Sequence, residues 1–135
     1  MVCEDSATVE YCKKKCNSKY IHFTTNLLDC ESFDILVSIG TLQVAGDYFL
    51  NEFKKIKNKP KIILLGHIEV TNSNSFYSLT KNGIVHFTIN EEQLKKYFFD
   101  LGYQIKDDWN ERILYGTVLF HSDLSIMLKG YYFER

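Results

Sequence analysis

An acidic and aromatic segment in the C-terminal part of the chain is the clearest candidate for a binding site. Its sequence is Asp107-Asp108-Trp109-Asn110-Glu111, so the only tryptophan of the chain stands among three carboxylates. Tryptophan is enriched at the energetic centres of protein interfaces, and a charged rim steers a partner of opposite sign. A tryptophan that plugs the edge of the core is the alternative interpretation. The residues we expect to bind a positively charged protein partner are Asp107, Asp108, Trp109 and Glu111.

Histidine and glutamate side chains offer a second possibility, acid–base or metal chemistry. His67 and Glu69 are two residues apart, so they share one face if they lie on a strand. His86 on a neighbouring strand would complete a trio able to move a proton or hold a metal ion. However, the sequence lacks the local motifs of P-loop nucleotide binding, serine hydrolysis and zinc proteolysis. The balance favours a protein that is not an enzyme and has no catalytic residues and no cofactor, with the trio as the enzymatic alternative.

Four cysteines within the first 30 residues are the other candidate metal ligands: Cys3, Cys12, Cys16 and Cys30. On a helix, the spacing of Cys12 and Cys16 places both thiols on one face, and a third and fourth ligand could complete a zinc site. No two cysteines have the two-residue spacing that is typical of zinc sites. We therefore expect reduced thiols and no metal, with zinc binding as an open alternative.

A lysine-rich segment is the candidate for nucleic-acid binding. It contains Lys54, Lys55, Lys57, Lys59 and Lys61, which together could contact phosphates while sheet aromatics stack on bases. The segment also follows a predicted helix, where cations complement the negative end of the helix dipole. The net charge is only -1, with 16 Lys and Arg against 17 Asp and Glu, so no overall field attracts nucleic acid or a membrane. Nucleic-acid binding is therefore the less favoured alternative, and no membrane partner is expected.

A helix over 91–101 is the best-defined element that must position these residues. Asn90 is a preferred N-cap residue, Gln93 follows three positions later, and Gly102 favours a left-handed stop. The helical spacing predicts that four side chains point inward, namely Leu94, Tyr97, Phe98 and Leu101.

Asn82-Gly83 predicts a two-residue type I′ turn that joins strands 76–81 and 84–89 into a hairpin. A strand over 62–71 precedes the hairpin, so three consecutive antiparallel strands are expected. The turn length pairs Lys81 with Ile84, Leu79 with His86 and Tyr77 with Thr88, and it directs Val85, Phe87 and Ile89 to the core.

Further elements are predicted with weaker signals. Apolar spacing favours a helix from Thr41 to Asn58, which Gly46 weakens and Pro60 ends. Strands are predicted over 20–25, 112–120 and 124–133, so the acidic segment would be the loop that precedes the last two strands. The segment 26–40 fits either a helix or a strand.

The composition is typical of one globular domain over residues 1–135, with 45% hydrophobic and 24% charged residues. The elements predict an α+β fold, with an antiparallel sheet of about five or six strands and two amphipathic helices mainly on one face. No secretory signal or membrane span is visible, so we expect a cytoplasmic protein. We expect a small protein-binding module, of the kind exemplified by an immunity-type inhibitor that neutralises a basic toxin or nuclease. The sequence leaves the oligomeric state and the identity of the partner open.

Overall fold

The computed structural model describes residues 1–30, 32–80, 82–111 and 126–135, and these form an α+β fold as expected. The main sheet has six strands in the order β5-β6-β4-β8-β7, with β3 also paired to β4. The central strand β4 pairs in parallel with β3 and β6 and antiparallel with β8. The strands of this sheet are β3 (Ile35–Ile39), β4 (Ile62–Thr71), β5 (Phe76–Leu79), β6 (Val85–Asn90), β7 (Gln104–Glu111) and β8 (Ile126–Glu134).

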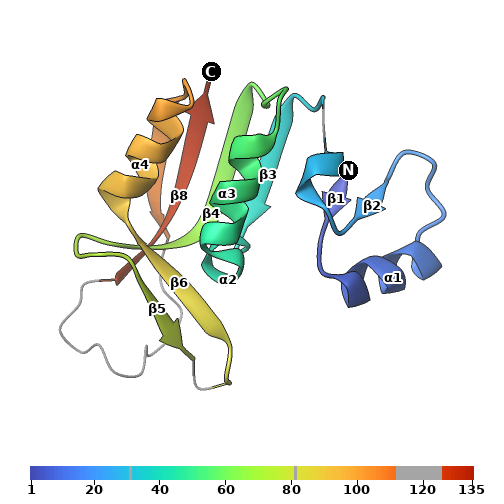
Figure 1. The fold of residues 1–135 in the computed structure, drawn as a ribbon, viewed down its shortest axis with the longest axis horizontal. Coiled ribbons are helices and arrows are strands. Elements are labelled where there is room, and N and C mark those ends of the chain that lie inside the picture. Colours follow the sequence, from blue (N-terminus) through green and yellow to red (C-terminus); the bar gives the residue numbers. More distant parts are fainter. Residues whose placement is uncertain (31, 81, 112–125) are drawn as a thin grey trace.

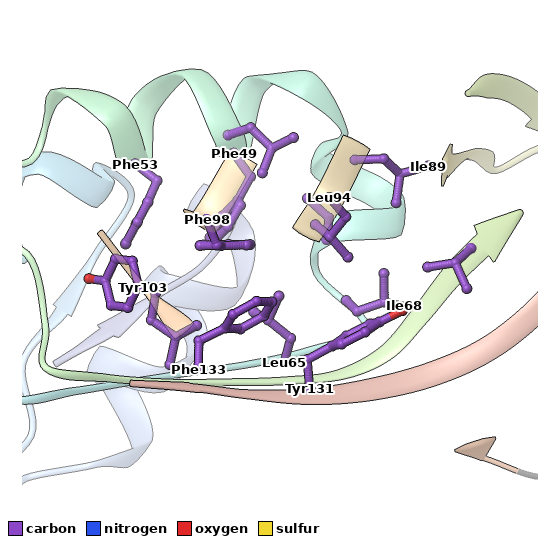
Figure 2. Packing of buried hydrophobic residues seen from close by; sticks show 14 of the residues in the cluster. Phe49, Phe53, Leu65, Ile68, Ile89, Leu94, Phe98, Tyr103, Tyr131 and Phe133 are labelled. Carbon is purple, nitrogen blue, oxygen red and sulfur yellow. The ribbon is translucent and has the colours of Figure 1, made fainter. Parts of the chain in front are cut away.

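The helices α2 (Leu42–Ala45), α3 (Asp47–Lys55) and α4 (Glu91–Asp100) lie over one face of the sheet (Figure 1). Aromatic side chains fill the space between these helices and strands β4 and β8 (Figure 2). Phe98 is fully buried, and the centroid of its ring lies 4.6 Å from that of Phe133. The core therefore occupies the helix side of the sheet.

The helix predicted over 91–101 is confirmed as α4. The Asn90 side chain accepts a hydrogen bond from the Gln93 backbone N–H at 2.9 Å, and Gly102 ends the helix with φ of 88°. Leu94 and Phe98 are fully buried, and the other two predicted inward residues, Tyr97 and Leu101, pack at the margin of the core. Local capping signals therefore predicted this element well.

The single helix expected from Thr41 to Asn58 is instead two helices, α2 and α3. The chain breaks at Gly46, which adopts φ of 55°, and a Cβ added there would lie 2.8 Å from the Tyr77 hydroxyl oxygen. A side chain at this position would be strained and would also clash. The apolar periodicity was nevertheless informative, because Leu42, Phe49, Phe53 and Ile56 are all buried.

The predicted hairpin forms, but its register is shifted by one residue. The Thr80 N–H donates to the Ile84 carbonyl at 2.8 Å, so the loop between these residues is one residue longer than expected. The Ile84 N–H also donates to the Thr80 hydroxyl at 3.0 Å, and Gly83, with φ of 77°, takes the left-handed position at the end of a three-residue loop. Lys81 of the predicted turn lies outside the described residues.

The observed pairs in the hairpin are Tyr77 with Phe87, Ser78 with His86 and Leu79 with Val85. Phe87 and Ile89 are buried as expected, whereas Val85 is exposed.

The three consecutive antiparallel strands were predicted wrongly. Strand β4 pairs in parallel with β6, through Val70 with Ile89 and Thr71 with Asn90, and β5 lies on the outer side of β6. The polar connection over 72–75 therefore does not fold β5 back onto β4. This choice of partner depends on contacts between distant residues, which local turn signals do not specify.

The acidic segment expected as a loop is part of strand β7, which pairs antiparallel with β8. Charged side chains are tolerated there because β7 is an edge strand that is exposed to water along most of its length. The predicted strand over 124–133 corresponds to β8, whose described part begins at Ile126. The other predicted strand, over 112–120, lies outside the described residues.

The N-terminal elements lie beside β3 in Figure 1 and form a separate two-stranded sheet. Strand β1 (Val2–Cys3) pairs in parallel with β2 (Phe23–Thr24), and α1 (Ser6–Lys15) and the 3-10 helix η1 (Leu27–Asp29) flank them. The strand expected over 20–25 is thus shorter than predicted, and the open segment 26–40 contains η1 and β3. Among the described residues, every helix is too short or too polar to cross a membrane.

Candidate functional site

The face of the sheet opposite α3 and α4, here called the open face, carries the aromatic residue singled out in the sequence. Directly paired residues share a face, so Val37, Leu64, Tyr132 and Asp107 form one row across strands β3, β4, β8 and β7. The neighbouring residues Tyr131 and Phe133 are buried in the core, which fixes this row on the other side. Trp109 and Glu111 alternate with Asp107 along β7 and therefore also lie on the open face.

Trp109 lies across a glycine of the neighbouring strand. It is paired with Gly130, and a Cβ added to Gly130 would fall 2.1 Å from Cε2 of the indole. The side chain remains 40% exposed, so Trp109 is not a plug buried in the core. The absence of a side chain at Gly130 lets the indole pack directly against the backbone of β8, while part of the side chain stays exposed.

The Glu111 carboxylate holds the indole of Trp109 through a hydrogen bond. Its Oε1 accepts hydrogen bonds from Trp109 Nε1 at 3.3 Å and from the His67 backbone N–H at 3.1 Å. Its Oε2 contacts His67 Nδ1, and the carboxylate side chain is only 16% exposed. Glu111 is therefore a positioning residue for Trp109 rather than part of an exposed acidic rim.

An irregularity in β4 brings His67 to this carboxylate. The pairing of β4 with β8 shifts between Leu65 and Ile68, and His67 has φ of 53°. Positive φ is uncommon outside glycine and marks a local departure from the regular strand. Sequence reasoning missed His67 at this site, since no local signal predicts the shift.

The acidic residues predicted to act together are divided between the two faces. Asp107 is exposed on the open face, whereas Asp108 alternates to the helix side. There, Asp108 Oδ2 lies 2.9 Å from Lys129 Nζ. The structure thus brings Trp109, Asp107 and Glu111 to one face and assigns Asp108 to a separate ion-pair cluster.

That cluster connects α4, β7 and β8 through a buried carboxylate. Lys129 Nζ lies 2.8 Å from Glu91 Oε1, and Lys95 Nζ lies 2.8 Å from the same oxygen. Burial by itself would raise the pKa of Glu91, but hydrogen bonds from Lys129 and Lys95 outweigh it and hold the pKa below its usual range. The cluster is structural, because each charge in it has a partner within the protein.

The residues of the enzymatic alternative are only partly assembled. His86 Nδ1 lies 2.7 Å from Glu69 Oε1, and the Thr88 hydroxyl donates to Glu69 Oε2 at 3.2 Å. His67 does not join them, because it pairs with Glu111. Within the described ranges, no three His, Cys, Asp or Glu side chains lie close enough together to hold a metal ion.

The lysine segment of the nucleic-acid alternative is largely engaged within the protein. Lys59 Nζ donates to the backbone carbonyls of Lys54 and Ile56 at the end of α3, as expected for cations at a helix C-terminus. Lys55 pairs with Glu52, and Lys61 lies 3.6 Å from Asp34. Two of the sheet aromatics, Tyr131 and Phe133, are buried and are not available to stack on bases.

The four cysteines are free thiols in the structure. Cys12 is in α1 and Cys16 caps its C-terminus, whereas Cys3 is in β1 and Cys30 follows η1. Burial raises the pKa of both Cys3 and Cys30, which disfavours the reactive thiolate.

The candidate site is therefore the open face around Trp109, where Gly130 and Glu111 hold the indole and Asp107 adds an exposed charge. This arrangement combines a partly exposed aromatic side chain with an exposed carboxylate. Comparisons with protein-family models and with curated proteins find no match for the chain.

Proposed function

We propose that this chain is a protein-binding module that docks a basic partner protein on the open face, with Trp109 as the anchor. The observation that carries this proposal is the fixed and partly exposed indole, held by Gly130 and Glu111. An aromatic anchor that is already fixed before binding loses little conformational entropy when it is buried. Aromatic residues in such positions commonly supply much of the energy of an interface.

The charges of the open face support a basic partner. Asp107 is exposed, and Glu134 lies in the next row of the same face, paired with Ile62 and Gln104. Lys106, which is 3.9 Å from Glu134, offsets only part of this negative charge. Complementary charge would accelerate association with a cationic surface.

Apolar side chains extend the same surface toward β3. Ile35, Val37 and Ile39 are exposed by 51%, 58% and 63%, and they lie on the open face because their paired residues do. A contiguous apolar patch of this kind is typical of an interaction surface. An immunity-type inhibitor that neutralises a basic toxin or nuclease in the cytoplasm is the specific form of this proposal.

Photocrosslinking in the native cell tests the proposal. The probe p-benzoylphenylalanine replaces Tyr132 on the open face, and the matched control replaces Tyr48, which is 63% exposed on α3. We expect a covalent adduct with one basic protein from position 132, no such adduct from position 48, and loss of the adduct when Trp109→Ala is added. Equal adducts from both positions, or an adduct that persists without Trp109, would contradict the proposal.

A further inference from the structure

Among the described strands, β7 stands at one edge of the main sheet, and most of its residues are exposed. It is the last strand in the sheet order, and it pairs with β8 on its inner side. In a strand, the backbone N–H and C=O groups of alternate residues point to opposite sides, so half of those in β7 face away from β8. The described residues place no further strand beside this edge, which can accept an added strand.

A hollow of about 700 Å³ lies between α4 and the first half of β7. Phe99 of α4 and Ile105 of β7 line it, and they are 70% and 39% exposed. The lysines at this hollow are already paired, Lys95 with Glu91 and Glu92, and Lys96 with Asp100. The hollow therefore offers apolar surface to a neighbouring chain on the helix side of β7.

The two sides of β7 thus differ in chemistry. The helix side offers Phe99 and Ile105, whereas the open face offers Asp107 and Trp109. The pairing of β7 with β8 shifts between Ile105 and Asp107, so these two residues lie on opposite faces although they are two positions apart. A strand added beside β7 therefore meets apolar side chains on its helix side and Asp107 and Trp109 on the open face. Apolar residues suit one side, and lysine or arginine residues suit the other.

We infer that the partner binds by adding an extended segment of alternating apolar and basic residues to the outer edge of β7. The inference rests on the proposed function and specifies how the partner is recognised. Its backbone pairs with β7, its apolar side chains enter the hollow beside Phe99, and its cationic side chains approach Asp107 on the open face.

The charge of β7 favours a basic segment over a second copy of this chain as the added strand. Asp107 is exposed on β7, whereas Asp108 and Glu111 are paired with Lys129 and His67, so a second β7 would bring another exposed Asp107 to the same edge, where like charges repel. Charged edge strands commonly prevent self-association in this way. A basic strand meets no such repulsion, which makes it the favoured partner.

Alternate N-methylation of a peptide tests backbone pairing directly. The probe is a fluorescein-labelled peptide of about eight residues that alternates valine and lysine, a typical strand length. Two further peptides carry N-methyl groups on one or the other set of alternate amides, and a fourth has glutamate in place of lysine.

In fluorescence anisotropy, we expect the unmodified peptide and one methylated peptide to bind. The other methylated peptide should lose about tenfold or more in affinity, because its donors to β7 are blocked. The glutamate peptide should not bind.

Two variants locate the peptide on the protein. Phe99→Ala should weaken binding of the unmodified peptide about tenfold, whereas Tyr48→Ala, which removes an equally exposed aromatic from α3, should leave it unchanged. Equal binding of both methylated peptides, no saturable binding below about 1 mM, or equal effects of the two variants would overturn strand addition.

The failure of this inference is distinct from failure of the proposed function. If Trp109→Ala abolishes the adduct with the native partner but both methylated peptides bind equally, the open face is the binding site and strand addition is wrong. If the adduct persists in Trp109→Ala, the proposed function itself is wrong, whatever the peptides do.

Discussion

At the scale of single residues, the orientation of Trp109 depends on the absence of a side chain at position 130. Gly130→Ala should displace the indole, because the added Cβ would lie 2.1 Å from Cε2. Since Trp109 is the only tryptophan, its fluorescence emission reports on this site alone. We expect a red-shifted emission maximum in Gly130→Ala and weaker partner binding.

Gly66→Ala is the matched control, because its Cβ would meet Ile39 and Glu111 at ordinary distances of 3.4 and 3.5 Å. An unchanged spectrum in Gly130→Ala would contradict the described packing.

The two neighbouring aspartates should have different effects on binding. Asp107→Asn removes an exposed charge from the open face and should slow association with the basic partner and reduce its salt dependence. Asp108→Asn removes a charge already paired with Lys129 at 2.9 Å, so the association rate should change little. Stopped-flow measurements at several salt concentrations check both. If both variants slowed association equally, the ion pair of Asp108 with Lys129 would not reduce the effect of the Asp108 charge on binding.

The sequence pointed to Trp109 as a candidate anchor but did not predict its surroundings in the fold. Trp109 stood out by its type and its acidic neighbours, whereas its contact with Gly130 follows from the pairing of β7 with β8. The contribution of His67 could not be predicted, because it depends on the shift in β4 that sends its N–H to Glu111. The separation of Asp107 from Asp108 follows from the alternation of a strand, and the segment was expected to be a loop.

At the scale of elements, α4 offers a direct test of inward packing. Phe98→Ala should destabilise the protein by about 3 to 5 kcal/mol, the usual loss for a buried phenylalanine. The adjacent Phe99→Ala is the matched control, since Phe99 is 70% exposed and should cost less than about 1 kcal/mol. Urea titrations of both variants give the comparison. Similar losses of stability would contradict the described orientation of the helix.

Elements with local signals were predictable, and elements that depend on pairing were less so. Helix α4 has its cap and its stop in adjacent residues, so its ends followed from the sequence. The break at Gly46 depends on Tyr77, a residue far along the chain, and the hairpin register depends on the Thr80 hydroxyl. In β7, pairing with β8 overrides a charged composition that is unfavourable for a strand in isolation.

At the scale of the whole molecule, the Glu91 cluster couples stability to pH. Hydrogen bonds from Lys129 and Lys95 lower the pKa of Glu91 against the opposing effect of burial. A carboxylate with a lowered pKa contributes stability above its ordinary value near 4.5, and this contribution is lost as the pH falls through the lower value in the folded protein. Glu91→Gln should therefore be less stable than the native protein at neutral pH and should lose less stability on acidification. Thermal unfolding between neutral and acidic pH checks this, and parallel curves would contradict it.

The α+β class was predictable for the whole molecule, but the strand order was not. Apolar periodicity indicated α4 and the strands β4, β6 and β8, but it left residues 26–40 open and did not predict β7. The parallel pairing of β4 with β6 and the position of β8 between β4 and β7 arise from contacts over long sequence separations. The open face is a consequence of that order, so its extent could not be predicted from the sequence.

Docking through Trp109 is tested by measuring the affinity of the crosslinked partner, once purified, for the native protein, Trp109→Ala and Tyr48→Ala. Trp109 is partly exposed on the sheet, so its truncation should leave the circular dichroism spectrum and cooperative unfolding intact. We predict that Trp109→Ala binds about 30-fold more weakly, equivalent to about 2 kcal/mol, and that Tyr48→Ala binds like the native protein. A folded Trp109→Ala protein with native affinity would contradict the account.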